Sequence, residues 1–189
     1  MTSPTPSTTP ATTTTSPMAP PTTTTTTPSP ITSASRTPDP ARPEGPDGAL
    51  FDAIATEHGV IYGYGVVSAH STPEDNALVA EAMAQHRARR EEALVMLAEG
   101  SVTPPLPAAG YELPLEVTDP GDAAELAVRM ESDTATAWRA VAEQAQTPED
   151  RRFAVTAMTQ AAVLAARWNQ VLGVPQITTA FPGGPEKAG

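Results

Sequence analysis

The sequence predicts an all-α protein: a four-helix bundle that follows a long tail without regular structure. After residue 48, apolar residues recur at helical spacing in four long segments, and helix start and stop residues stand between these segments. Of the first 30 residues, 26 are Thr, Pro or Ser, and such a composition cannot bury enough apolar surface to offset the entropy of ordering. We therefore expect a disordered tail over residues 1–48, one folded domain over 49–183 and a disordered C-terminus over 184–189.

The first helix is expected from Ala49 to Ala69 and is apolar almost all the way round, which is typical of a helix in the middle of a bundle. Gly59, Gly63 and Gly65 each cost about 1 kcal/mol of helix propensity relative to Ala. Three glycines in this one helix indicate that a neighbouring helix approaches its backbone closely.

Three further helices follow. They are expected from the Thr72-Pro73 turn to Glu99, from Asp119-Pro120 to about Gln146, and from Thr147-Pro148 to Leu172. The second and fourth begin with the same Thr-Pro-Glu-Asp turn, which offers an N-cap, a proline for the first helical position and acids that suit the helix dipole. Glycines follow the second and fourth helices, and Ile177 and Phe181 of the C-terminal segment are expected to pack on the bundle.

Residues 101–119 form a long connection with four prolines, and its apolar residues predict that it lies against the bundle. Two short turns and one long crossover between the second and third helices describe two antiparallel hairpins. This is the topology of a ferritin-like antiparallel four-helix bundle. The repeated turn agrees with a pseudo-twofold relation between the hairpins.

A di-iron centre in such a bundle needs a Glu on each of two helices and a Glu-x-x-His pair on each of the other two. Glu57 on the first helix, and Glu131 or Glu125 on the third, meet the first requirement. On the second helix Glu81 and His86 are five residues apart and point about 140° away from each other. The fourth helix has no acid or histidine after its first turn. The sequence therefore predicts that the di-iron carboxylate site is incomplete.

The remaining polar residues of the helices are expected to meet inside the bundle. We predict an internal network of Glu57, Tyr64, His86, Arg89, Arg90 and Glu131. Glu57 is expected to pair with Arg90, and Glu131 with Arg89 or His86, because a buried arginine is costly without an acid. The alternative is a metal or small-ligand site with Glu57, His58, His86 and Glu131 as candidates, holding a single Zn or Fe ion. The nearby arginines would repel a cation, which favours the network.

Composition and charge exclude several classes of function. The net charge is −11, and residues 1–48 hold only −1 of it, which leaves −10 for the folded part. Such an acidic domain is a poor match for nucleic acid or anionic membrane. The absence of Cys excludes disulfides and thiolate chemistry. No secretory signal pattern and no apolar run long enough for a membrane span is present, so a cytoplasmic location is expected.

Residues 49–183 resemble an actinobacterial family of ferritin-like domains of unknown function. The resemblance rests on Glu57-His58, Tyr62-Gly63-Tyr64-Gly65, the run from His86 to Arg90, and Ala180-Phe181-Pro182-Gly183. It implies the ferritin-like bundle and brings no established activity.

The sequence therefore favours a non-catalytic module that binds a partner protein or self-associates, with a homodimer formed by packing on the first helix. No catalytic residue and no cofactor is predicted. The alternative is a metal- or small-ligand-binding protein, and so an enzyme in one version, that uses the intra-bundle Glu/His site.

Overall fold

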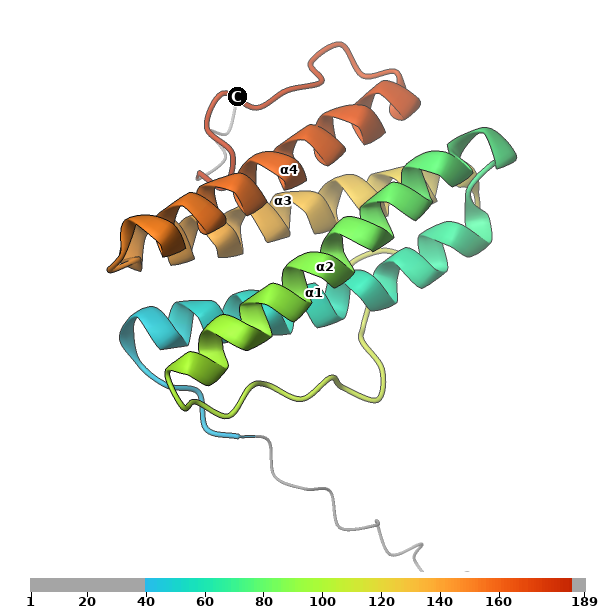
Figure 1. The fold of residues 1–189 in the computed structure, drawn as a ribbon. Helices are drawn as coiled ribbons and strands as arrows, with labels where there is room; N and C mark the ends of the chain where they lie inside the picture. Colours follow the sequence, from blue (N-terminus) through green and yellow to red (C-terminus); the bar gives the residue numbers. More distant parts are fainter. Residues whose placement is uncertain (1–39, 185–189) are drawn as a thin grey trace, which may run out of the picture. The chain divides into compact units, whose positions relative to one another are not determined.

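The computed structural model describes residues 40–184 and contains four α-helices and no strand within that range (Figure 1). The helices are α1 (Gly45–His70), α2 (Asn76–Glu99), α3 (Pro120–Gln144) and α4 (Pro148–Leu172), and a short 3-10 helix, η1 (Pro73–Asp75), precedes α2. The predicted all-α four-helix bundle is confirmed. The predictions made for residues 1–39 and 185–189 lie outside the described residues.

Helix α1 begins at Gly45, ahead of the predicted start at Ala49. Pro46 occupies one of the first two positions and Asp47 lies in the first turn, and both residue types favour a helix start. Arg42 stands just before the helix and binds the carboxylate of Asp52 side-on, with Nε donating over 2.7 Å to Oδ1 and Nη2 over 2.6 Å to Oδ2. The start signals were missed because they belong to a stretch rich in Pro and Gly.

The two Thr-Pro-Glu-Asp turns behave differently. The Thr147 hydroxyl oxygen accepts a hydrogen bond from the backbone N–H of Asp150 over 3.1 Å, as expected of an N-cap. The Thr72 hydroxyl instead donates to the Asp75 carboxylate over 2.8 Å, and the turn after it forms the 3-10 helix η1. Helix α4 ends at Gly173, whose φ of +68° is left-handed, as expected of a glycine stop.

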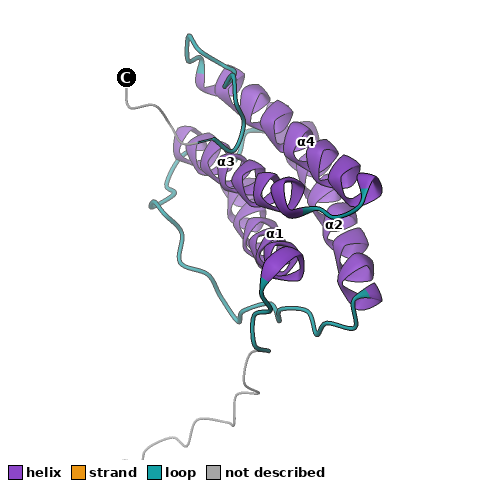
Figure 2. Ribbon diagram, turned by 90° about the vertical axis from the view of Figure 1, so that its left-hand side faces the viewer, coloured by secondary structure: helices purple, strands orange, loops and turns teal. Residues whose placement is uncertain are grey.

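The helices form two hairpins, α1 with α2 and α3 with α4, which run side by side (Figures 1 and 2). Helix α1 packs closely against α2 and α3, and α3 packs closely against α4, whereas α2 and α4 do not pack comparably. The connection between α2 and α3 runs along the outside of the α1–α2 hairpin (Figure 1). There the ring of Tyr111 lies 5.3 Å from that of Tyr62, and Leu113, Leu115 and Val117 pack against the core. The connection therefore covers part of the apolar surface of α1, although Tyr62 remains 44% exposed.

The three glycines of α1 have different surroundings. A Cβ at Gly63 would collide with the Met130 side chain of α3, so α3 approaches α1 closely here, as predicted from the sequence. At Gly59 a Cβ would meet the ring of Tyr111 at 3.5 Å, an ordinary contact. At Gly65 it would meet nothing within 4 Å, so nothing in the structure explains this glycine.

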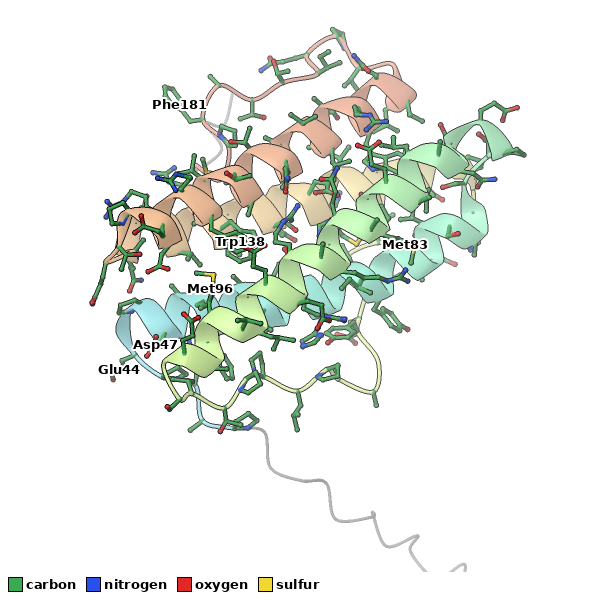
Figure 3. All side chains as sticks on the ribbon, viewed as in Figure 1. Glu44, Asp47, Met83, Met96, Trp138 and Phe181 are labelled. Atoms are coloured by element: carbon green, nitrogen blue, oxygen red, sulfur yellow. The ribbon has the colours of Figure 1, made fainter. Side chains whose placement is uncertain are left out.

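The apolar core consists of two clusters. One contains Tyr64, Leu126 and Trp168, and the other contains Ile54 and Trp138. Trp138 lies between the two hairpins in Figure 3. No helix in residues 40–184 has the length and apolar character needed to cross a membrane.

The C-terminal segment after α4 returns along that helix (Figure 1). Asn169 donates a hydrogen bond to the Ile177 carbonyl over 3.2 Å, and Gly183 lies against the backbone of Ala135. The predicted packing of Phe181 is wrong: its side chain points away from the bundle and is 78% exposed (Figure 3). The backbone contacts already anchor the segment without this ring.

Candidate functional site

A layer of buried polar side chains lies between the two apolar clusters. It contains Glu57 from α1, His86 and Arg89 from α2, and Glu131 and Thr134 from α3, and each of them is at most 3% exposed. Polar groups at such depth require partners, because burying an unpaired charge is very costly. The hydrogen bonds of these residues therefore define the site.

His86 bridges two carboxylates. Its Nδ1 lies 2.7 Å from Glu57 Oε2, and its Nε2 lies 3.0 Å from Glu131 Oε1. A carboxylate only accepts hydrogen bonds, so both ring nitrogens can donate at once only when the ring is an imidazolium. The arrangement thus joins α1, α2 and α3 through one protonated ring.

The pKa of His86 agrees with this geometry. Burial alone would lower it, but the hydrogen bonds and charges of Glu131 and Glu57 outweigh burial and raise the pKa from 6.5 to about 9. At neutral pH the two positive charges of His86 and Arg89 then balance the two negative charges of Glu57 and Glu131. The buried layer is therefore close to neutral as a whole.

Glu57 accepts hydrogen bonds from three side chains. The Trp138 indole Nε1–H donates to Oε1 over 2.7 Å, and Arg89 Nη1 donates to the same oxygen over 3.1 Å, while His86 binds Oε2. Burial raises the pKa of Glu57, but these three donors outweigh it, so that the pKa is lowered overall. Glu57 is therefore a carboxylate with both oxygens engaged.

Glu131 forms the other end of the network. The Tyr64 hydroxyl donates to Oε1 over 2.5 Å, and the Trp168 indole in turn donates to the Tyr64 oxygen over 2.9 Å. Burial and the charge of Glu131 raise the pKa of Tyr64 well above its usual value, so the phenol keeps its proton and remains a donor. Glu131 Oε2 is buried and has no hydrogen-bond partner among residues 40–184.

The contacts between α1 and α3 are reciprocal. Tyr64 follows Glu57 by seven residues on α1, and Trp138 follows Glu131 by the same seven on α3. Each aromatic residue donates to the carboxylate of the other helix. Since the later residue of one helix meets the earlier residue of the other, α1 and α3 are antiparallel. The two pairs set the register between them.

The structure brings together five of the six residues of the predicted network, namely Glu57, Tyr64, His86, Arg89 and Glu131. Arg90 is the exception, and the predicted pair of Glu57 with Arg90 is not formed. The Arg90 guanidinium binds Glu91 over 2.5 Å, and its side chain is 25% exposed. The reason is geometric: neighbouring residues differ by about 100° around a helix, so only one of the two arginines can face inward.

His58 also lies outside the network. It is next to Glu57 in the sequence and therefore points about 100° away from it around α1. Its half-buried ring is near Arg90 and the Pro105 carbonyl of the connection, and its Nε2 has no partner among the described residues. Burial and the charge of Arg90 lower the pKa of His58, so the ring is neutral. The alternative site built on Glu57, His58 and His86 together does not assemble in this arrangement.

Two members of the network were not among the predicted residues. Trp138 and Trp168 belong to the apolar core, and each indole also donates a hydrogen bond to the network. The signal that could have found Trp138 is the equal spacing of Glu57 with Tyr64 and of Glu131 with Trp138 on two expected antiparallel helices.

A metal ion at this site would have to compete with the network. Both His86 nitrogens are committed to carboxylates, so neither offers a lone pair to a cation. Over residues 40–184 no group of three His, Cys, Asp or Glu side chains is arranged to hold a metal. The donor geometry therefore fits an internal ion-pair network better than a coordination sphere.

A groove of about 510 Å³ lies between α2 and α4 and reaches the edge of the network. It is lined by Gln85, Ala88, Arg89 and Glu92 of α2 and by Glu149, Arg152, Phe153, Thr156, Ala157 and Gln160 of α4. Glu81 lies one turn before Gln85 on α2, and its ion pair with Arg167 of α4, over 2.6 Å, links the two helices. The groove is within the size range of small-ligand pockets.

Comparisons with other proteins agree with the resemblance seen in the sequence. Residues 49–186 match the family described as a domain of unknown function, DUF4439. The chain is also similar to a solved structure, that of a conserved hypothetical protein, rv2844, from Mycobacterium tuberculosis, with 59% sequence identity and a TM-score of 0.67. That match covers 67% of this chain and 96% of the other. No curated protein matches the chain.

The predicted resemblance to an actinobacterial family of unknown function is thus confirmed. Since the family match spans most of the bundle, the chain belongs to the DUF4439 family of domains of unknown function.

Proposed function

We propose that the domain is a non-catalytic binding module that takes a small ligand in the groove between α2 and α4. The observation that carries this proposal is the position of Arg89, which lines the groove and also belongs to the buried network. The network fixes the position of this groove residue, because Arg89 Nη1 donates a hydrogen bond to Glu57.

The engagement of His86 supports a non-catalytic role. A general base or nucleophile activator needs a free ring nitrogen within reach of a substrate. Both His86 nitrogens are bound to carboxylates, and the ring is fully buried. The network is therefore assigned to structure, and ligand binding to the groove beside it.

A fragment screen by two-dimensional NMR on the full chain tests the proposal. We expect bound fragments to shift the amide signals of Ala88, Phe153 and Ala157. Ala88→Trp fills the groove from an exposed position and should abolish those shifts, whereas Ala98→Trp, on the same helix but outside the groove, should leave them unchanged. Binding that survives Ala88→Trp, or no binding by any fragment, would refute the proposal.

Self-association is a second candidate. Most of the apolar surface of α1 that motivated it packs within the chain, and α4 exposes Val155, Val163 and Val171. These residues are eight positions apart and turn by about 80° from one to the next around the helix, so they offer separate apolar contacts rather than one continuous stripe. Light scattering at rising protein concentration tests this, and a monomeric mass throughout would remove the candidate.

A further inference from the structure

We propose that the groove is specific for a small ligand with one carboxylate, which binds side-on to the Nε and Nη2 edge of Arg89. This inference rests on the proposed function, because it names the chemistry of the ligand for the same groove.

The three nitrogens of Arg89 are used differently: one makes a normal hydrogen bond, one makes only a long one, and one has no partner among the described residues. Nη1 donates to Glu57 Oε1 over 3.1 Å. Nη2 lies 3.4 Å from Gln160 Oε1 on α4, beyond the usual range of an N–H···O hydrogen bond. Nε has no partner within residues 40–184, although the side chain is only 2% exposed. Buried N–H donors are almost always paired, so this edge indicates an acceptor that the chain does not itself supply.

The Nε and Nη2 protons of an arginine point in the same direction and match the two oxygens of a carboxylate. The chain already uses this geometry elsewhere: Arg42 binds Asp52 through Nε over 2.7 Å and Nη2 over 2.6 Å. Arg89 is one of the residues that line the groove, and Gln160, whose amide oxygen lies beside Nη2, is another. A ligand carboxylate that displaced Gln160 could make the same pair with Arg89.

Gln160 occupies the place expected for a ligand oxygen. Its amide oxygen is the one acceptor near this edge among the described hydrogen bonds of Arg89 on the α4 side, and the bond is long. The Gln160 side chain is exposed and can turn outward. A carboxylate that displaced it would exchange one weak neutral hydrogen bond for two charge-assisted ones.

The charges around the groove restrict the ligand further. Arg152 adds a second positive charge to the lining, but Glu92 and Glu149 add two negative ones. A polyanion such as a nucleotide phosphate chain would meet these carboxylates, whereas a single carboxylate can avoid them. Phe153 and Ala157 supply apolar surface, so the fitting ligand is a monocarboxylate with an apolar body.

The test compares two probes of the same shape, 3-phenylpropionate and the neutral 3-phenylpropionamide, by NMR titration of the full chain. We expect the carboxylate to shift the Arg89 Nε–H signal and to bind roughly tenfold more tightly, because charge-assisted hydrogen bonds are about twice as strong as neutral ones. Equal binding of both probes in the groove would overturn this inference and leave the binding module in place. If neither probe binds in the groove, the result would count against this inference and against the proposed function.

Gln160→Glu supplies the sharpest variant. It places a carboxylate of the chain on the free edge of Arg89, so the melting temperature should rise and 3-phenylpropionate binding should be lost. Gln170→Glu makes the same charge change at an exposed position of α4 outside the groove and should keep binding. Gln160→Ala uncovers Arg89 and should bind the probe at least as tightly as the wild type. Unchanged binding in Gln160→Glu would overturn the inference.

Discussion

Each carboxylate of the buried layer accepts hydrogen bonds from side chains of other helices. Because Glu57 and Glu131 are buried, water does not screen their charges, and these donors must balance them. Glu57 is the clearest case, since it meets His86, Arg89 and Trp138. A buried ion pair contributes little net stability when it is complete. Removing one partner is costly, because the other charge stays buried.

We therefore expect Glu57→Gln to destabilise the domain by about 3–5 kcal/mol, the usual cost of breaking a buried pair. The side chain keeps its shape but loses the charge that balances Arg89 and His86. Urea unfolding measures the change, and Glu91→Gln, at an exposed acid of α2, is the matched control. A loss no larger than that of the control would show that the layer is not charge-coupled.

The protonation of His86 predicts a dependence of stability on pH. Its pKa rises from 6.5 unfolded to about 9 folded, so its contribution is complete below pH 6.5 and is lost as the pH rises through about 9. The lowered pKa of Glu57 acts in the opposite direction, and its contribution is lost only as the pH falls through that lowered value.

The measurement is the free energy of unfolding at pH 6.5 and above pH 9. The wild type should lose stability over this range, and His86→Gln should lose much less, because it has no proton to release at this position. Parallel profiles for the two proteins would contradict a charged His86.

At the scale of the helix, α1 offers a matched pair of substitutions. Gly65→Ala should stabilise the domain by about 1 kcal/mol, since a Cβ there meets nothing within 4 Å and alanine has the higher helix propensity. Gly63→Ala should gain less than Gly65→Ala, because the Met130 side chain must move away from the new methyl group. Melting temperatures of the two variants test this, and equal shifts would show that the Met130 side chain moves aside at little cost.

The four helices were predictable because their apolar periodicity and their start and stop residues agree. Thr147 and Gly173 do what their residue types predict. The turn at Thr72 shows the limit of this reasoning, since the same four letters form a 3-10 helix there. The local sequence shows where an N-cap can form, and the packing of the helix decides whether it does form.

The members of the network could be predicted, but not all of their partners. Residue spacing places Glu57, His86 and Glu131 toward the bundle axis. It cannot decide between Arg89 and Arg90, which lie on opposite sides of the same stripe, because spacing alone does not fix how α2 is rotated about its axis. The groove and the role of Gln160 could not be predicted either, since both depend on the distance between α2 and α4.

At the scale of the whole domain, the two buried carboxylates that could have served as metal ligands are joined by a protonated ring. His86 lies between Glu57 on α1 and Glu131 on α3 and binds both. Added Zn or Fe should therefore leave the melting temperature unchanged. A rise in the wild type that disappears in His86→Gln would contradict this and favour the metal-site alternative.

The two indole hydrogen bonds have a practical consequence. The chain contains two tryptophans, and both are buried with their N–H groups bound to opposite ends of the network. Intrinsic fluorescence of the unlabelled protein should therefore report on the state of the buried layer. Because Trp138 shares Glu57 with Arg89, its emission should also respond to a ligand in the adjoining groove, which gives an optical assay that needs no added dye.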